Sequence, residues 1–343
     1  MSDAPIYIIG TERSGSNLLR LVLNAHSRIA VPHPLHMMRY FAPTEAARGD
    51  LGDPVILGKL VDEVLLLKRV HIHPWAYPID RQRIVDEAHP KDAMGVMGSL
   101  YDQVREAEGK ARWGCKSTFM VHYTERALAR DPGARFVLLV RDPRDVAASS
   151  RRSVFSPYHP WLTARLWTQQ QQLGLGLLDD LGPEQVHLLR YEDLLDQPEA
   201  SVRALCAFLD EGFEPGMLRF HEGREAQTSA GLSESWQNTA KPVLSNNAGK
   251  YRAHLTPSEV AMVESVCGSL MQRLDYPRDH PDATFDPGLR ERLEIHLRDL
   301  GWRTTVELRS MRRDRNHWRR WSRDATMRYL GARYRSIPTT KSC

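Results

Sequence analysis

The sequence predicts an α/β fold, a three-layer sandwich in which a central parallel sheet is flanked by helices. Two observations predict it: three short segments are mainly apolar, two of them without interruption, and each leads through a polar turn into a helical pattern. Continuous apolar runs are typical of strands that are buried on both faces. Because parallel neighbours need a crossover connection, repeated strand–helix units favour one parallel sheet that is covered on both sides.

The strand–helix units begin at the N-terminus. In the first, the run from Ile6 to Ile9 is followed by a turn that contains Gly and Ser. In the second, a run of Phe, Val and Leu ends before Arg141, and Asp145 supplies an acidic first helical turn. The predicted pairs are a strand at 6–9 with a helix at 17–24, a strand at 136–140 with a helix from 145, and a strand at 186–191 with a helix at about 198–209.

The segments between and after these units are predicted to be mainly helical. One exception is rich in Ser, Asn, Gly and Thr, and long loops in compact domains are often binding loops. Another segment has apolar residues at helical spacing and Thr256 as a plausible N-cap. The expected elements are a helical insertion at about 45–110 with helices near 53–68 and 81–107, a long loop at 223–247, and a helix at 256–274.

The formal net charge of +4 combines two unlike parts. Residues 301–343 hold 12 basic and 3 acidic residues, a net charge of +9, which leaves −5 for residues 1–300. We therefore expect a main domain at 1–280 and a basic C-terminal helical extension at 281–343. Three roles are open for this basic tail: packing of its aromatic residues on the body, recruitment of an acidic acceptor or a membrane surface, and, least favoured, nucleic-acid binding. The aromatic residues that alternate with arginines within residues 309–335 are Trp318, Trp321, Tyr329 and Tyr334.

Composition and targeting signals exclude several classes of protein. An apolar share of 41% and a charged share of 26% are ordinary for a folded domain and exclude a mainly disordered or collagen-like chain. The four cysteines show no metal-ligand spacing, so we expect them to be buried as small apolar residues. Residues 1–10 lack the features of a signal peptide, and no run approaches the roughly 20 apolar residues that span a bilayer. We expect a cytoplasmic protein.

A cationic loop separates the first strand from its helix. Residues 10–17 read Gly-Thr-Glu-Arg-Ser-Gly-Ser-Asn. The N–H groups at a helix N-terminus favour an anion, glycine permits close approach, and Arg13 with the hydroxyls can donate further hydrogen bonds. The lysine of the Walker A motif is absent, which weighs against an ATP-dependent kinase. The alternative is an ordinary Ser/Gly turn.

A second anion site is indicated after the second strand. Arg141 stands at the carboxyl end of this strand, and Ser149 lies eight residues later in the following helix. Ligands of open α/β sheets bind at the carboxyl ends of the strands, where the first loop also lies. Two anion sites on one edge suit a nucleotide with phosphates at both ends of its ribose. In the alternative, Arg141 forms a salt bridge with Asp145 and Ser149 is uninvolved.

Together these residues resemble a known family, the sulfotransferases that use 3′-phosphoadenylyl sulfate (PAPS). The loop at 13–17 resembles their 5′-phosphosulfate loop, and Arg141 with Ser149 resembles their 3′-phosphate motif. Other segments are similar to the branch that contains the tyrosylprotein sulfotransferases and their bacterial relatives, and the resemblance covers about residues 6–275. Those segments are Leu18-Leu19-Arg20, Asn24-Ala25-His26, Tyr191-Glu192-Asp193-Leu194, and Lys241-Pro242-Val243 with Lys250.

The resemblance implies a fold like that of P-loop NTPases. It also implies transfer of the sulfuryl group of PAPS to a hydroxyl or amine, with release of the nucleotide PAP. Lys116 matches a family lysine near the transferred group, where it would stabilise charge on the leaving oxygen; the alternative is a solvated surface lysine. The implied nucleotide contacts are Arg13, Ser14, Gly15, Ser16 and Asn17 for the 5′ sulfate and phosphate, Arg141 and Ser149 for the 3′-phosphate, and Tyr191, Ser235 and Lys250 elsewhere.

The catalytic base is predicted from a departure from the family pattern. Relatives in this branch place a glutamate at the position that Pro34 holds here, so the expected carboxylate is absent. His33 and His36 flank this position, and an imidazole is a natural general base near neutral pH. We favour His33 over His36; in the alternative, both only orient another base. No metal is expected, because the His-x-x-His pair has no third ligand in the motif.

The sequence leaves the acceptor open among small molecules, glycans, lipids and peptides. Aromatic residues of the insertion and the neighbouring segments could line its pocket or belong to the core, namely Trp75, Tyr77, Trp161 and Trp167. Peripheral membrane contact through the basic tail and a homo-oligomer are further hypotheses about partners. Two alternative functions are a P-loop-like phosphotransferase or kinase, and a non-catalytic anion- or membrane-binding protein led by the basic tail.

Overall fold

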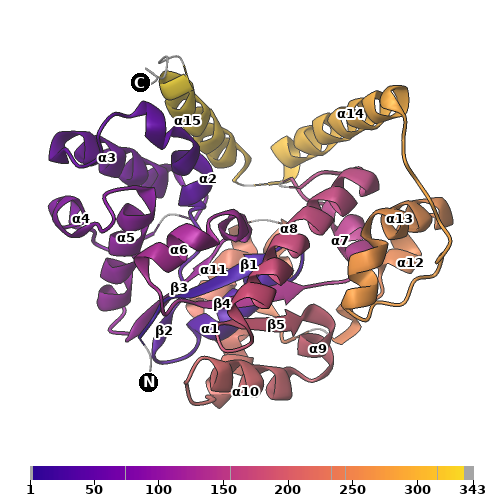
Figure 1. The fold of residues 1–343 in the computed structure, drawn as a ribbon, viewed down its shortest axis with the longest axis horizontal. Coiled ribbons are helices and arrows are strands. Elements are labelled where there is room, and N and C mark those ends of the chain that lie inside the picture. The colour runs from indigo at the N-terminus through magenta and orange to yellow at the C-terminus, as the bar shows by residue number, and fades with distance from the viewer. Residues whose placement is uncertain are drawn as a thin grey trace.

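A parallel sheet forms the centre of this computed structural model, and helices surround it (Figure 1). The structure describes residues 3–73, 75–154, 156–232, 234–243, 245–314 and 316–335. Within them the sheet has five strands in the order β2-β3-β1-β4-β5, and each neighbouring pair is parallel. The strands are β1 (Ile6–Gly10), β2 (Ile29–Ala30), β3 (Arg112–Lys116), β4 (Arg135–Val140) and β5 (Val186–Arg190).

The predicted fold class is confirmed, as are the strands β1, β4 and β5. Two strands escaped prediction because they carry no apolar run. β2 is two residues long, and β3 reads Arg-Trp-Gly-Cys-Lys with a cation at each end. Both lie on one side of β1, where all five residues of β3 are buried by the surrounding structure.

Helices form the two outer layers because the strands carry apolar side chains on both faces. Along β1, Ile6 and Ile8 belong to one buried cluster, whereas Tyr7 and Ile9 belong to the other. The helices that cover the two faces include α1 (Ser16–Asn24), α9 (Tyr191–Asp196) and α10 (Pro198–Phe208) on the first, and α5 (Ala93–Ala107) and α8 (Pro160–Leu181) on the second, where α13 (Pro257–Arg273) packs on α8. Predicted helices at 17–24, 198–209 and 256–274 are thereby confirmed, and Thr256 caps α13 in a capping box.

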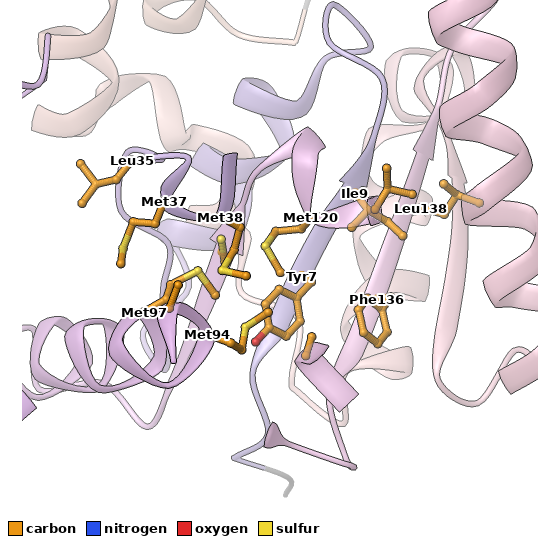
Figure 2. Close-up of a cluster of buried hydrophobic side chains, with 14 of the residues drawn as sticks. Tyr7, Ile9, Leu35, Met37, Met38, Met94, Met97, Met120, Phe136 and Leu138 are labelled. Carbon is orange, nitrogen blue, oxygen red and sulfur yellow. The ribbon is translucent and has the colours of Figure 1, made fainter. Parts of the chain in front are cut away.

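A methionine-rich layer joins the helical insertion to the sheet (Figure 2). The short helix α2 (Met37–Phe41) contributes Met37 and Met38, and α5 contributes Met94 and Met97. These side chains lie in the same buried cluster as Tyr7 of β1. Flexible thioethers fill irregular gaps, so this layer holds α2 against α5. It thereby positions the segment that connects β2 to α2.

The insertion and the segment before α12 differ in detail from prediction. The insertion contains α3 (Pro54–Val70), but the helix expected at 81–107 is two helices, α4 (Arg81–Glu87) and α5, with residues 88–92 between them. The prediction of a long loop at 223–247 was wrong, because much of this segment is helical. The remaining elements are η1 (Ala42–Ala47), η2 (Thr118–His122), α6 (Thr124–Arg130), α7 (Pro143–Ser150), η3 (Pro215–Glu222), α11 (Arg224–Leu232), η4 (Glu234–Ala240), η5 (Ser245–Asn247) and α12 (Tyr251–His254).

The C-terminal region forms two long helices, α14 (Leu289–Arg313) and α15 (His317–Arg335), which diverge from a short connection (Figure 1). Helix α15 packs on the insertion: Met327 and Leu330 join the main buried cluster, and the Tyr334 hydroxyl donates to Glu63 over 2.8 Å. Of the four aromatic residues within residues 309–335, Tyr334 therefore packs on the body. Trp318, Trp321 and Tyr329 are exposed.

Two smaller predictions concern cysteines and membrane spans. Cys115, Cys206 and Cys267 are free and buried, as expected for small apolar residues, and Cys343 lies outside the described residues. Among the helices that the structure describes, none has the combination of length and apolarity needed to cross a membrane.

Candidate active site

The carboxyl edge of the sheet gathers the predicted site residues. Every strand contributes there, because parallel strands end on the same edge. The contributions are Arg13 after β1, His33 and His36 after β2, Lys116 at the end of β3, Arg141 after β4 and Tyr191 after β5. All of these line one cavity with a volume of about 970 Å³, together with Gly15, Ser16, Asn17, Ser149 and Lys250.

The loop after β1 has the backbone geometry that an anion site needs. Helix α1 starts at Ser16, so its first N–H groups face the loop. Gly15 has φ +92°, and a Cβ added there would meet the Tyr191 ring at 2.3 Å. Arg13 also has a positive φ of 71°, which is uncommon for a residue with a side chain and often marks functional sites. The loop is therefore held in a shape that only this packing against Tyr191 allows.

The two predicted anion motifs contact each other directly. Arg13 Nε donates to Ser149 Oγ over 3.2 Å, and Arg141 Nη1 donates to the Arg13 carbonyl over 3.0 Å. Arg141 Nη2 donates to the Asn247 carbonyl over 2.9 Å and lies 3.5 Å from Asp145. The salt bridge that was the alternative reading of Arg141 thus exists, but it is the longest of these contacts. Asp145 is itself engaged by the backbone N–H groups of Gly249 and Tyr251.

Several buried polar atoms of these motifs have no partner within the described part of the chain. They include Ser14 Oγ, which is fully buried behind the loop, and Arg141 Nε. Buried donors without a partner are costly, and sites for charged ligands are a common reason for them. A phosphate or sulfate on the loop would meet Arg13 and Arg141 with few competing carboxylates, so the residues present fit an anionic nucleotide.

The remaining predicted nucleotide contacts surround the Arg141 side. Tyr191 lies under the Arg141 guanidinium, 4.6 Å from cation to ring centroid, and its hydroxyl accepts a hydrogen bond from Asn247 Nδ2 over 2.7 Å. Lys250 lines the cavity close by. The side chain of Ser235 lies outside the described part of the structure, so its predicted contact stays a prediction.

Lys116 is a buried lysine and not a surface one. Its side chain is 9% exposed, it lines the cavity, and the solvated alternative is therefore wrong. The pKa of Lys116 is lowered from 10.5 to about 8, mainly by burial; Glu12 opposes this shift, and the cations Arg20 and Arg13 add to it. Burial and neighbouring Arg141 likewise lower the pKa of Arg13 to about 10. A buried lysine and a half-buried arginine whose charged forms are disfavoured in this way would be stabilised by a bound anion.

His33 is enclosed by other rings. It stacks on His73 at 4.8 Å between centroids, lies 5.4 Å from His71 and meets Trp236 edge-on at 4.8 Å. Neither ring nitrogen has a hydrogen-bond partner among the described residues, and both nitrogens are buried. Burial and the nearby Arg20 charge hold the pKa of His33 well below 6.5. The ring is neutral but shielded.

His36 is more open and better oriented. It is half-buried, and its Nδ1 shares a hydrogen bond of 2.9 Å with Ser117 Oγ, which leaves Nε2 as the second ring nitrogen. It precedes α2 at a positive φ of 53°, a second uncommon backbone geometry on this edge. Burial and the Lys116 charge hold the pKa of His36 well below 6.5, so the ring is neutral at physiological pH.

Some cavity residues were not singled out from the sequence. Glu12 lines the cavity beside Lys116 and accepts a hydrogen bond from Ser156 Oγ over 3.0 Å. Arg39 of α2 and Arg323 of α15 also line it, and only their positions in the fold reveal this. Conversely, the aromatic residues proposed as an acceptor wall do not line this cavity: Trp75, Trp161 and Trp167 are buried in the body, and Tyr77 packs against the core.

The comparison with protein families decides between the functions that remain. The model described as "Sulfotransferase family" matches residues 5–215. The chain belongs to this family. The predicted resemblance is thereby confirmed, together with sulfuryl transfer from PAPS as the activity, and the phosphotransferase and non-catalytic alternatives are set aside.

Relatives of this sulfotransferase include eukaryotic enzymes. Protein-tyrosine sulfotransferase A of Caenorhabditis elegans is 21% identical over 317 residues, which are 87% of this chain and 74% of the relative. Protein-tyrosine sulfotransferase 2 of Gallus gallus is 23% identical over 285 residues, 79% of this chain and 69% of the relative.

Among solved structures, the sulfotransferase domain from the curacin biosynthetic pathway has the same fold. It is 22% identical with a TM-score of 0.56, covering 80% of this chain and 99% of that one. The domain from the Synechococcus PCC 7002 olefin synthase is 21% identical with a TM-score of 0.56, covering 77% and 94%. Among the described residues of the present protein, no group of three or more His, Cys, Asp and Glu side chains is arranged to hold a metal ion.

Proposed function

We propose that this sulfotransferase acts on a hydroxyl group with His36 as general base and with Lys116 and Arg13 as the cations that stabilise the transition state. The observation that carries the proposal is the cavity itself: it brings His36, Lys116 and Arg13 from three different strand ends to one edge of the sheet. Sulfuryl transfer to a hydroxyl needs these two kinds of group, a base at the acceptor and cations at the leaving oxygen.

Binding of the nucleotide is assigned to the loop and its partners. Ser14, Gly15, Ser16 and Asn17 present the loop and the N-terminus of α1 to the 5′ end, with Arg13 beside them. Arg141 and Ser149 serve the 3′-phosphate, and Tyr191 and Lys250 lie on the same side of the cavity. When bound, PAPS supplies the activated sulfuryl group and leaves as PAP. Ser235 is retained as a contact on its resemblance alone.

The acid–base roles follow from which group is neutral and which is charged. His36 has a lowered pKa, so its Nε2 is free to accept the acceptor's proton at neutral pH, while Ser117 fixes the ring through Nδ1. Lys116, with a pKa of about 8, stays mostly protonated at pH 7 and can hold negative charge that grows on the leaving oxygen. His33 was favoured from the sequence, but its shielded nitrogens support a packing role beside His73.

Two experiments test these assignments. Arg13→Ala and Arg141→Ala should each weaken PAP binding, measured by calorimetry, by at least about tenfold. Charge-assisted hydrogen bonds provide much of the binding free energy of a phosphate site, and each variant removes one guanidinium. Unchanged affinity in both variants would remove the nucleotide assignment. For the base, His36→Ala should lose turnover and regain part of it with added imidazole, whereas His33→Ala should not respond to imidazole. The reverse pattern would return the role to His33.

The acceptor is not narrowed to one class of molecule. The curated relatives are protein-tyrosine sulfotransferases by name, which supports a hydroxyl acceptor on a peptide as one candidate beside small molecules, glycans and lipids. A cytoplasmic location, membrane contact through the basic tail and a homo-oligomer stay predictions.

A further inference from the structure

The C-terminal helices reach the cavity although they lie outside the part of the chain that matches the family model. That match ends at residue 215, whereas Trp302, Val306 and Arg309 of α14 and Arg323 of α15 line the cavity. Part of the cavity wall is therefore built by the basic tail. An appendage that merely covered the body would leave the cavity complete without it.

The two helices are fixed around this opening at separate points. Asp299 of α14 accepts hydrogen bonds from the backbone N–H groups of Tyr158 and His159, over 2.8 and 2.9 Å. Asn316, in the connection, donates to the Leu232 carbonyl of α11 over 2.8 Å. At the far end, Arg48 lies 4.0 Å over the Tyr334 ring. These contacts hold the pair as a wall and place Arg323 over the insertion.

Two cavity arginines, one from α2 and one from α15, lie on the side of His36, whose ring meets Phe119 edge-on at 5.5 Å. Arg39 lies three residues after this histidine in α2, and Arg323 comes from α15; both charges contribute to the lowered pKa of His36. Arg39 forms no ion pair with a described carboxylate and lies 4.5 Å over the Phe119 ring. Arg323 is 7% exposed and donates through Nε and Nη2 to its neighbour Asp324, an ion pair that orients the guanidinium and partly offsets its charge.

This pair is distinct from the nucleotide cations. Arg13, Arg141 and Lys250 serve the loop and the α7 side, where Arg141 contacts Arg13 and Tyr191. Arg39 and Arg323 instead lie on the side of His36, which under the proposed function faces the acceptor. Positive charge beyond that required by the nucleotide indicates an anionic group on the acceptor. Arg39 is exposed, whereas Arg323 is buried, so a contact with Arg323 is less screened by solvent.

We propose that the C-terminal helix pair completes the acceptor site, and that Arg323 together with Arg39 selects acceptors that carry an anionic group near the hydroxyl. Trp302 and Val306 of α14 supply apolar surface beside this charge. Arg323 and Arg39 are thus specificity-determining residues. The inference rests on the proposed function only in that His36 marks the acceptor side.

The test uses matched pairs of hydroxyl compounds that differ in charge alone: 4-hydroxyphenylacetate with 4-hydroxyphenylacetamide, 3-hydroxybenzoate with 3-hydroxybenzamide, and 6-hydroxyhexanoate with 6-hydroxyhexanamide. Binding to the full chain saturated with PAP is measured by calorimetry. We expect the carboxylate of at least one pair to bind about tenfold more tightly than its amide, since a charged hydrogen bond contributes that much or more. Arg323→Gln and Arg39→Gln should each reduce this ratio, and the double variant should abolish it.

Arg319→Gln is the matched control, because Arg319 is an exposed arginine on α15 that does not line the cavity. It should keep the ratio, and every variant should bind PAP as the unaltered protein does. A ratio near one in all pairs, including failure of every compound to bind, would overturn the inference, as would a ratio that survives in the double variant. Failure of the proposed function has a different signature, namely PAP affinity that does not respond to Arg13→Ala and Arg141→Ala.

Discussion

Replacing Lys116 by methionine should stabilise the protein while removing its activity. The lysine stands at the end of a buried strand, 9% exposed, and forms no ion pair with a described carboxylate. Methionine has a similar length and volume without the charge, so it removes the ammonium and leaves the packing almost unchanged. A residue that serves catalysis at the expense of the fold is expected to behave in this way.

The magnitude follows from the pKa. In the folded protein the pKa of Lys116 is lowered from 10.5 to about 8, so the folded state binds this proton less tightly than the unfolded chain does. The charge on Lys116 therefore lowers the free energy of unfolding. This destabilisation is complete below about pH 8 and disappears as the pH rises toward 10.5. At about 1.4 kcal/mol per pKa unit, the penalty is about 3 kcal/mol near pH 6.5 and about 1.5 kcal/mol near pH 9.5.

The assay is urea unfolding of the nucleotide-free protein at both pH values. Lys116→Met should raise the free energy of unfolding by about 3 kcal/mol near pH 6.5 and by about half as much near pH 9.5. Lys59→Met, at an exposed position of α3, is the control and should change it by less than about 0.5 kcal/mol at either pH. Equal stability of Lys116→Met and the unaltered protein near pH 6.5, or a gain that does not depend on pH, would refute the reasoning.

Three further outcomes are expected. Gly15→Ala should weaken PAP binding by at least about tenfold, because the new Cβ meets the Tyr191 ring at 2.3 Å and Gly15 has φ +92°; unchanged affinity in calorimetry would contradict the steric cause. Thr256→Ala should cost about 1 kcal/mol of stability in urea through loss of the α13 cap, with PAP affinity unchanged as the check on specificity. The pH profile of kcat/KM should show no fall centred near 6.5, because the pKa of His36 lies well below that value, and such a fall would speak against a buried histidine base.

The loop after β1 and the turn after β4 could be predicted because their chemistry is local. A buried strand, a glycine, a cation and a helix start follow one another within residues 6–17, and the same holds for residues 136–149. Each of these motifs needs only its own residues to form. Their mutual contact, with Arg13 on Ser149 and Arg141 on the Arg13 carbonyl, then follows from the parallel sheet that places both ends on one edge.

Other features depend on contacts that no local pattern contains. Residues 224–232 are helical although their composition indicates a loop, and Arg20, fully buried in α1, donates to both Glu225 and Ser229 of that helix. A buried arginine that needs these partners fixes the segment from 205 residues away in the chain. The position of Arg323 in the cavity could not be predicted from the sequence for the same reason. It depends on the packing of Met327 and Leu330 in the main buried cluster, which brings α15 to the cavity.

The net charge of the chain gave little guidance to the site because the cations of the nucleotide motifs, Arg13 and Arg141, are held mainly by neutral groups. Arg141 is positioned by the carbonyls of Arg13 and Asn247, and Arg13 by the hydroxyl of Ser149. Neutral partners orient a guanidinium without cancelling its charge, whereas a close carboxylate would have to be displaced or tolerated when the anion binds. Asp145 supports this reading, since its oxygens are occupied by Gly249 and Tyr251 and lie farther from Arg141 than the carbonyls do. An acidic body can therefore bind a polyanionic nucleotide, because the charges that face the cavity, and not the sum over the chain, decide the binding.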